Sequence, residues 1–386
     1  MEPILSAVSS NADQLYTLLR CIGFAPKASV QITPDGIRFS VEEGRVMQGL
    51  AFLDKTLFST YTFNAPPTES SNAHDESDEE GVTYPRFLIS LSALLETLQI
   101  FGINDTSATN SSAAPQPNPS SSNAFTTPAL LLNRSCTIQY PHLGAPLSIT
   151  LSEAGIKTTC ELTTYEPDDP SFGSYAGELD IPLQRDAIIL KIIMRSTWLH
   201  NAITELDATN PTVLTLSASA KREPFFALSG SGGPFSESTV EFSIEKESEN
   251  GSGASALSHT NQHKVISSEG GGSSRSRAAK KAKLAPTVTE TFLVSPPSSM
   301  GSRVKQNYRF ALIRKASRAM AAANKVSIRG DRQGVLSLQF MIELGDNNAG
   351  LGGNISFVDF RFVPLVDEEE ARDDDDDQGE RGNEEE

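Results

Sequence analysis

The sequence has few cysteines and no long apolar run. Its three cysteines, Cys21, Cys136 and Cys160, show no C-x-x-C spacing. A disulfide scaffold and a zinc finger are therefore excluded, and we expect buried thiols in a reducing compartment. Nowhere do about 18 uninterrupted apolar residues occur, and the segment 1–10 lacks the charged and apolar regions of a signal peptide. We expect a soluble intracellular protein that does not bind a membrane.

Catalytic motifs are also missing. The chain has no G-x-x-x-x-G-K-[ST], no G-x-S-x-G and no G-x-G-x-x-G that opens a helix after a strand, so no apparatus for phosphate binding or acyl transfer is visible. His259 and His263 have no glutamate between them, which argues against a metal site. A metal-dependent DNA exonuclease needs grouped carboxylates, and Glu161, Asp207 and Asp359 occur only singly. We expect no enzyme activity, no catalytic residue, no metal and no cofactor.

Negative charge is abundant but unevenly distributed. The net charge is -17, yet the segment 367–386 holds 13 acidic residues against 2 arginines, and the segment 69–80 adds 6 acidic residues. Subtracting these contributions of -11 and -6 leaves a total of zero for the rest of the chain. The acidic pI therefore does not exclude a nucleic-acid partner for the folded part.

Three polar stretches interrupt the hydrophobic pattern: 64–84, 104–128 and 247–302. They are rich in Ser, Gly, Asn and Pro, and we predict that all three are disordered insertions. The third stretch contains a cluster of five basic residues: Arg275, Arg277, Lys280, Lys281 and Lys283. This cluster predicts a nuclear import signal and hence a nuclear protein, with an incidental solvated charge run as the alternative.

The remaining segments repeat one order of elements four times: a strand, a helix and three further strands. Apolar periodicity places the helices at 11–22, 91–101, 198–206 and 310–322. Alternating or apolar runs predict strands at 4–8, 29–33, 36–41, 46–53, 87–90, 136–140, 147–151, 156–163, 187–194, 212–218, 224–228, 239–244, 304–308, 325–328, 335–342 and 355–363.

Hairpin connections exclude a doubly wound parallel sheet, so we predict an α+β fold with antiparallel sheets that two helices per domain cover on one face. The four repeats form two similar domains, 1–163 and 185–366. An acidic connector at 164–184 joins them, and an acidic disordered tail occupies 367–386.

Two such domains in tandem resemble the DNA sliding clamps. Five segments narrow the resemblance to the Rad-one subunits of the nine-one-one DNA damage checkpoint clamp: Gly36-Ile-Arg-Phe-Ser-Val-Glu-Glu43, Thr204-Glu-Leu-Asp207, Lys325-Val-Ser-Ile-Arg329, Leu336-Ser-Leu-Gln-Phe-Met-Ile342 and Ile355-Ser-Phe-Val-Asp359. The resemblance implies a non-catalytic subunit of a heterotrimeric ring that encircles DNA at damage sites and supports checkpoint signalling and repair. It also implies Rad-nine and Hus-one type partner subunits and an ATP-dependent loader. A homotrimeric replication clamp is the alternative.

A clamp of this kind contacts the phosphates of double-stranded DNA without sequence specificity, through helices that line the channel. Within 310–322, Arg314, Lys315 and Arg318 share one face of the predicted helix, and Arg20 and Lys27 are further candidates. A solvated basic face without a partner is the alternative. The predicted helices at 91–101 and 198–206 offer little positive charge, which favours a heterotrimer.

Exposed edge strands are expected to join neighbouring subunits. By their place in the repeats, these edges are 156–163 and 239–244. The candidate interface residues are Ile156, Thr159, Glu161, Thr239, Phe242 and Ile244.

Overall fold

The computed structural model describes residues 2–65, 84–100, 135–153, 155–167, 180–244, 289–345 and 354–365. The α+β class with antiparallel sheets is confirmed: every strand pair is antiparallel and each lies in one of three sheets. None of the described helices is long and apolar enough to cross a membrane.

The N-terminal half is built from two rounds of the predicted unit, with one further strand between them. Its elements are β1 (Leu5–Ser9), α1 (Ala12–Cys21), β2 (Lys27–Thr33), β3 (Gly36–Glu43), β4 (Met47–Asp54), a 3₁₀ turn (Lys55–Leu57), β5 (Thr60–Phe63), β6 (Arg86–Ser90), α2 (Leu91–Leu98), β7 (Ser135–Tyr140), β8 (Leu147–Glu153) and β9 (Ile156–Leu162). The extra strand β5 was not predicted. It pairs with β1 at the edge of its sheet.

The C-terminal half repeats the same order. Its elements are a 3₁₀ turn (Arg185–Ala187), β10 (Ile188–Arg195), α4 (Ser196–Asp207), β11 (Val213–Ala218), β12 (Phe226–Ser231), β13 (Glu237–Phe242), β14 (Thr289–Val294), a 3₁₀ turn (Ser298–Met300), β15 (Val304–Arg309), α5 (Phe310–Arg314), α6 (Ser317–Ala322), β16 (Lys325–Asp331), β17 (Leu336–Leu344) and β18 (Asn354–Phe362). Strand β14 occupies the same place in this half as β5 does in the first, because it pairs with the first strand of its half, β10.

Two features of the C-terminal half differ from the prediction. The stretch 247–302 is not wholly disordered, since β14 lies inside it and adds six residues to a sheet. The single helix predicted at 310–322 is two short helices. Lys315 and Ala316 donate backbone hydrogen bonds to residues three positions back instead of four, which tightens the chain and separates α5 from α6.

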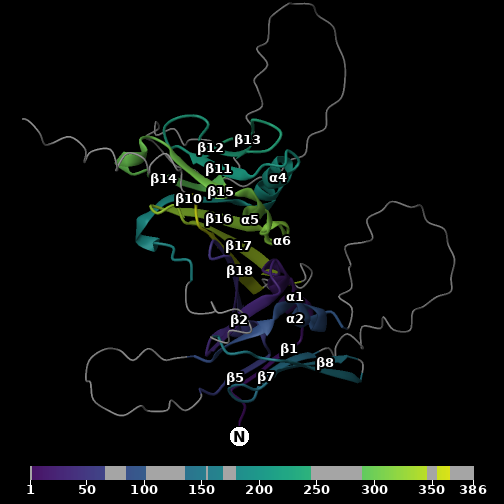
Figure 1. Cartoon of the computed structure of the whole chain (residues 1–386). Helices are drawn as coiled ribbons and strands as arrows, with labels where there is room; N and C mark the ends of the chain where they lie inside the picture. Colours follow the sequence, from purple (N-terminus) through teal and green to yellow (C-terminus); the bar gives the residue numbers. More distant parts are fainter. Residues whose placement is uncertain are drawn as a thin grey trace, which may run out of the picture.

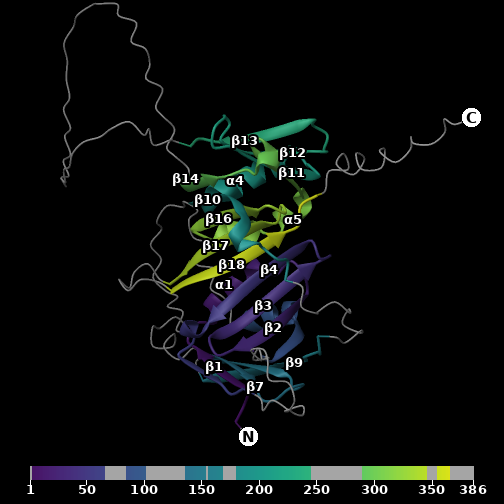
Figure 2. The ribbon, with the colours of Figure 1, turned by 90° about the vertical axis from the view of Figure 1, so that its left-hand side faces the viewer.

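A nine-stranded sheet joins the two halves. Its order is β14-β10-β16-β17-β18-β4-β3-β2-β6, and the junction is the pairing of β18 with β4, in which Asp359 lies opposite Leu50. Figure 2 shows this sheet face-on, with β18 of one half directly beside β4 of the other. The halves therefore share one hydrogen-bonded sheet across their boundary.

All the described helices lie on one side of the nine-stranded sheet, as Figure 1 shows. Helix α1 contacts α2 in its own half and α6 in the other half, and α6 contacts α4. Helix α1 begins at Asn11, whose side-chain oxygen accepts hydrogen bonds from the amides of Asp13 and Gln14 at 3.0 and 3.3 Å. The helices thus form a continuous row from one end of the molecule to the other.

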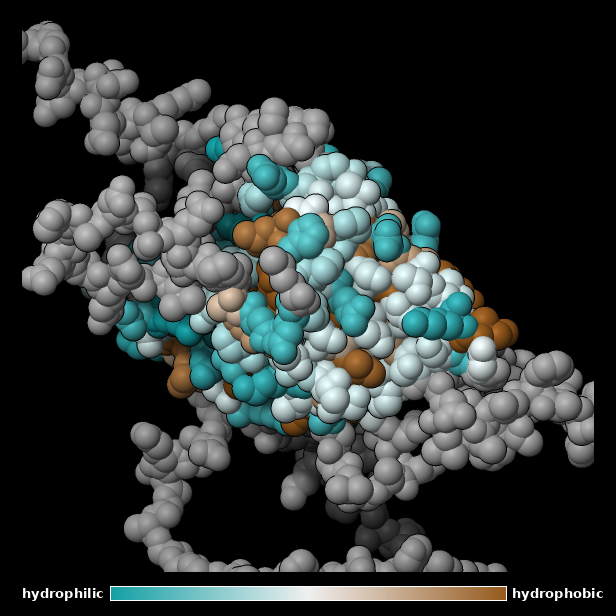
Figure 3. All heavy atoms as spheres, turned by 90° about the horizontal axis from the view of Figure 1, so that it is seen from below, coloured by the Kyte–Doolittle hydropathy of each residue, from teal (hydrophilic) through white to brown (hydrophobic). Residues whose placement is uncertain are grey.

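The five-stranded sheet, β5-β1-β7-β8-β9, closes the N-terminal end. A row of polar residues crosses its outward side, because register places Thr62, Ser6, Gln139 and Ser148 next to one another. Viewed from below, this end of the molecule shows polar and neutral residues with scattered apolar ones (Figure 3). The outward side of this sheet is therefore a polar surface.

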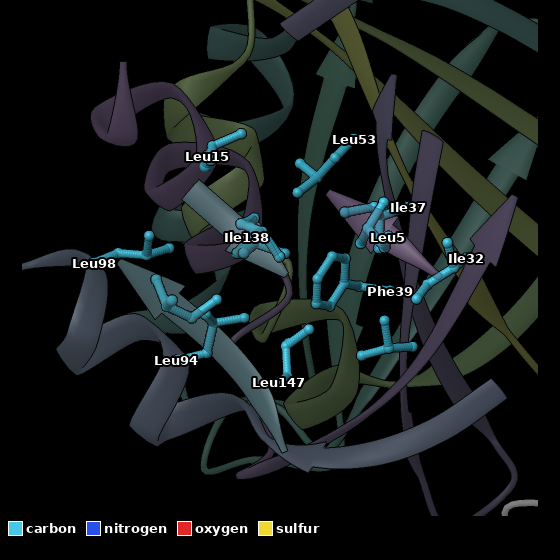
Figure 4. Close-up of a pocket in the computed structure, with 13 residues that line it drawn as sticks. Leu5, Leu15, Ile32, Ile37, Phe39, Leu53, Leu94, Leu98, Ile138 and Leu147 are labelled. Carbon is cyan, nitrogen blue, oxygen red and sulfur yellow. The ribbon is translucent and has the colours of Figure 1, made fainter. Parts of the chain in front are cut away.

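The core of the N-terminal half lies between its two sheets and the helices α1 and α2. Side chains from all four point toward one another, among them Leu15, Phe39, Leu94 and Leu147 (Figure 4). The space left for the centre of a water-sized sphere is about 10 Å³, which is no more than the smallest cavity that holds one water. This region is a close-packed interior and not a ligand site.

Candidate DNA-facing and subunit interfaces

The basic side chains of α5 and α6 lie on the side of these helices that faces away from the core. Phe310, Ile313 and Met320 are buried, whereas Arg314 and Arg318 are exposed. The split between an apolar and a basic face agrees with the sequence prediction despite the break between the two helices.

Two of these cations already have carboxylate partners. Arg314 Nη1 lies 3.1 Å from Asp207 Oδ1 at the end of α4. Lys315 Nζ donates to Glu43 Oε2 at the end of β3, in the other half of the molecule. Half-exposed pairs of this kind contribute little to stability, but each one cancels a positive charge. We therefore expect Arg314 and Lys315 to attract phosphate less than their sequence pattern suggested.

Arg20 and Arg318 come together at the C-terminal end of α1. Arg318 Nη1 donates to the carbonyl of Gly23 at 3.3 Å. Burial raises the pKa of the Cys21 thiol to about 12, against the opposing positive charges of Arg20 and Arg318. Both guanidinium groups are therefore close to the same thiol, and both side chains are exposed. They form the strongest positive feature on the helical side among the described residues.

Lys27 and the remaining helices add little positive charge. Lys27 is exposed at the first residue of β2, opposite Ser90. Helix α2 carries Glu96 as its one charged residue, and α4 carries Glu205 and Asp207 together with His200. Lysine and arginine within the described helices are thus confined to α1, α5 and α6.

Strands β9 and β13 each lie at the end of a sheet, where the sequence placed the candidate edges. Thr159 Oγ1 lies 3.0 Å from Thr150 Oγ1 on β8, and Thr239 Oγ1 lies 2.8 Å from Ser229 Oγ on β12. These hydroxyls sit on corresponding edges of the two halves. Contact with another subunit at either edge stays a prediction.

The other predicted interface residues differ in exposure. Ile156 is 62% exposed, and Glu161 is also exposed. Ile244 is partly buried against the core. Phe242 is buried at 8% and its ring stacks on Phe226 with centroids 4.8 Å apart. Phe242 is therefore a core residue at the end of β13, and its side chain offers little to a partner.

Sequence reasoning missed two half-buried residues on these edges. Cys160 lies opposite the buried Ile149, and Val240 lies opposite the buried Leu228. Cys160 was expected to be a buried thiol, but an edge strand has no neighbour to cover its outer side. The alternation of side chains along each strand could have predicted both residues, because each lies an even number of positions from a side chain that faces the core.

The end of the connector docks on the junction between the halves. Asp180 accepts hydrogen bonds from Arg38 on β3 and, at 2.7 Å, from Gln48 on β4. Arg361 on β18 donates to the carbonyl of the buried Ile181 at 2.7 Å. Burial raises the pKa of the Asp180 carboxyl, but the hydrogen bonds and charge of Arg38, then Gln48 and Arg361, outweigh it and hold the pKa below its usual range. The connector thus links strands on both sides of the β18–β4 junction, through the Asp180 carboxylate on one side and the Ile181 carbonyl on the other.

The carboxylates considered for a nuclease remain apart. Asp207 pairs with Arg314, and Asp359 accepts hydrogen bonds from Ser337 and Arg361. Glu161 is exposed on β9. Within the part of the chain that the structure describes, no group of three or more His, Cys, Asp or Glu side chains could hold a metal ion.

Three charged segments of the sequence analysis lie outside the described residues. They are the basic cluster Arg275, Arg277, Lys280, Lys281 and Lys283, the acidic segment 69–80 and the tail 367–386.

Comparison with known proteins identifies the family. A family model described as "Repair protein Rad1/Rec1/Rad17" matches residues 4–342. The chain belongs to the Rad1 family. It is 30% identical over 355 residues to the DNA damage checkpoint control protein rad1 of Schizosaccharomyces pombe, covering 91% of this chain and 84% of that protein. It is 28% identical over 360 residues to the human cell cycle checkpoint protein RAD1, covering 93% and 91%.

A solved structure supports the sliding-clamp fold. The chain matches PCNA from Thermococcus kodakaraensis with a TM-score of 0.54 over 94% of this chain and 100% of that one, at 14% identity. The expected clamp fold is confirmed. A more distant relative is the DNA repair exonuclease REC1 of Mycosarcoma maydis, at 25% identity over 206 residues, which cover 53% of this chain and 39% of that protein.

Proposed function

We propose that the chain is a non-catalytic subunit of a heterotrimeric ring that encircles duplex DNA at sites of damage and supports checkpoint signalling and repair. Its partners are the Rad-nine and Hus-one types of clamp subunit, and an ATP-dependent loader opens the ring. The observation that carries this proposal is the arrangement of elements: all described helices form one row on one side of the nine-stranded sheet. Membership of the Rad1 family supports the choice of partners.

In such a ring the helical side faces the DNA. Arg20 and Arg318 contact phosphates there, with Lys27 nearby, while Arg314 and Lys315 exchange their carboxylate partners for phosphate only when DNA is close. Phosphate contacts position a protein on DNA without reading bases. The ring is therefore expected to hold double-stranded DNA of any sequence.

Charge favours a ring of different subunits over a homotrimer. Helices α2 and α4 carry no lysine or arginine, so other subunits would supply part of a basic channel. The β13 edge carries Glu237 and Glu241 and no cation. The β9 edge carries one residue of each sign, Lys157 and Glu161. A partner strand that presents lysine or arginine would complement β13 better than β9 of a second copy.

Exonuclease activity is the second candidate function, and the name of the distant relative REC1 is what favours it. That match covers about half of this chain, no three described carboxylates are grouped, and Asp207 and Asp359 already have other partners. Two-metal hydrolysis requires several carboxylates within a few ångströms of each other. We therefore propose that the chain is not an enzyme.

We also propose a nuclear location, supported by the basic residues between Arg275 and Lys283 and by the checkpoint names of the relatives. A variant designed to remove this cluster should delete 246–286 and keep β14. The wider stretch 247–302 includes that strand, so its removal would take an edge strand from the sheet.

Native mass spectrometry tests the subunit composition. We expect the 41.5 kDa chain to be a monomer when purified alone, and to form a single complex of one copy of each subunit with the Rad-nine and Hus-one type proteins. The same preparation, incubated with Mg²⁺ and labelled duplex DNA, should release no nucleotides. A stable trimer of this chain alone would contradict the heterotrimer and support the homotrimeric alternative.

A further inference from the structure

A cleft of about 450 Å³ opens on the face of the nine-stranded sheet opposite the helices. It lies over β14, β10 and β16, on the side that Figure 2 turns toward the viewer. The end of the connector forms its rim. Its lining residues are Leu183, Arg185, Ile188, Ile189, Leu190, Lys191, Leu293, Ser295 and Arg329.

Every charged side chain that lines this cleft is positive. Register places Lys191 on β10 between Leu293 on β14 and Arg329 on β16, and Arg185 joins them from the rim. No carboxylate of the described chain lines the cleft. Within the described residues, none of the three cations forms an ion pair.

Arg329 is also incompletely hydrogen-bonded. Its Nε atom is buried and has no acceptor among the described residues. A buried donor without a partner costs free energy that an anionic acceptor would recover. The cleft is therefore suited to a ligand that carries carboxylate or phosphate oxygens.

The cleft also has an apolar side. Leu293 is 59% exposed and lies on β14, the edge strand of the sheet. Leu183 and Ile188 line the same hollow from the connector and the start of β10. A polypeptide with several carboxylates can cover this hollow and contact all three cations, whereas a bare inorganic anion can contact only part of it.

The described chain ends close to this cleft. Leu365 donates its backbone N–H to Asn307 O at 2.7 Å, and Pro364 lies against Gly334, where a β-carbon added to the glycine would be 2.8 Å from the proline ring. Gly334 ends a turn that begins at Asp331. The other side of the same turn holds the rim of the cleft, because Gln184 N donates to Asp331 Oδ2 at 3.0 Å and Arg332 N donates to Ala187 O at 3.1 Å.

We propose that the acidic segment 366–386 of this chain binds in the cleft, with its carboxylates on Arg185, Lys191 and Arg329. The segment has 13 acidic residues against 2 arginines, and Val366 is its one large apolar residue. An extended chain advances roughly 3.3 Å per residue, so the first five residues span roughly 17 Å. That reach is long enough to bring Asp367 to Glu370 from the turn toward the cations of the cleft.

Binding of this segment neutralises the basic patch on the outer face. Duplex DNA would otherwise be attracted to it as well as to the helical side, because phosphate attraction does not depend on sequence. The acidic segment thus acts as an internal competitor that leaves the helical side as the preferred DNA surface. This consequence rests on the proposed function, whereas the binding itself does not.

Zero-length carbodiimide crosslinking of the full-length chain tests the binding, because it joins a lysine amine to a carboxylate only when the two are in contact. At low salt we expect Lys191 to be the main lysine joined to carboxylates of 367–386. Lys157 on β9 is the internal control, since it is exposed, carries the same amine and lies in the sheet of the other half. The yield at Lys191 should fall about tenfold or more in 1 M salt, where the Debye length is about 3 Å.

The variant Arg185→Glu with Arg329→Glu keeps the reactive lysine and reverses its surroundings. We expect it to lose the Lys191 crosslink and keep whatever low yield Lys157 shows. Arg185→Glu alone, at an exposed position, reports the same loss in part if the double variant melts early. Equal yields at Lys191 and Lys157, or a Lys191 yield that survives both variants, would overturn the proposal.

Discussion

Proline placed on the β9 edge is expected to abolish ring assembly without unfolding the chain. Successive residues of a strand point their N–H groups to opposite sides, so one of Thr158 and Thr159 donates toward β8 and the other points outward. Proline removes the donor at its own position. The variant that loses the outward donor should keep the melting temperature of the parent and fail to form a complex with the partner subunits. The other variant should lose stability as well.

Each proline variant is therefore the control for the other. Size-exclusion chromatography with the partner subunits and thermal melting of the chain alone are the two measurements. The same pair of substitutions at Thr239 and Val240 tests β13. Phe242 is unsuitable, since its buried ring stacks on Phe226 and its loss would damage the core. Full assembly of both β9 variants would remove this strand from the subunit interface.

Reversal of Arg20 and Arg318 to glutamate is expected to give the largest loss of DNA affinity. These two exposed cations lie together at the end of α1, and each is expected to contact one phosphate. Each lost contact lowers the slope of log K against log salt by about 0.9, so the double variant should show a slope smaller by about 1.8. Fluorescence anisotropy of the assembled ring on duplex DNA across a salt series measures both affinity and slope.

The controls distinguish a local effect from a loss of net charge. Lys305→Glu changes charge on an exposed side chain of β15, outside the helices, so it should leave the slope unchanged. Lys315→Glu is a poor control, because it would set two carboxylates against each other at the contact with Glu43. An unchanged slope in the Arg20 and Arg318 variant would place the DNA elsewhere.

The repeated order of elements could be predicted because periodicity is a local property. Leucines at helical spacing predicted α1 and α2, and alternation predicted β2, β3 and β17. The strands β5 and β14 were missed since each is a short edge strand beside a polar stretch, so composition outweighed a weak alternation. The break between α5 and α6 was missed because an Ala- and Arg-rich segment has no local signal against a continuous helix.

The candidate sites were only partly predictable, because they depend on contacts between distant residues. The basic face of α5 and α6 follows from the sequence, but the pairing of Lys315 with Glu43 joins residues 272 positions apart. The cleft beside β14 combines Arg185, Lys191 and Arg329 from three segments. Only the fold brings these cations together, and no single segment looks basic.

Topological linkage to DNA is the most direct test of the proposed ring. The complete complex is loaded by its ATPase onto a nicked circular duplex, washed in high salt to remove contacts that depend on charge, and divided into two samples. One sample is cut once with a restriction enzyme. We expect the complex to stay on the intact circle and to leave the linear DNA by sliding off its ends. Equal retention on circular and linear DNA, or equal loss from both in high salt, would contradict encirclement.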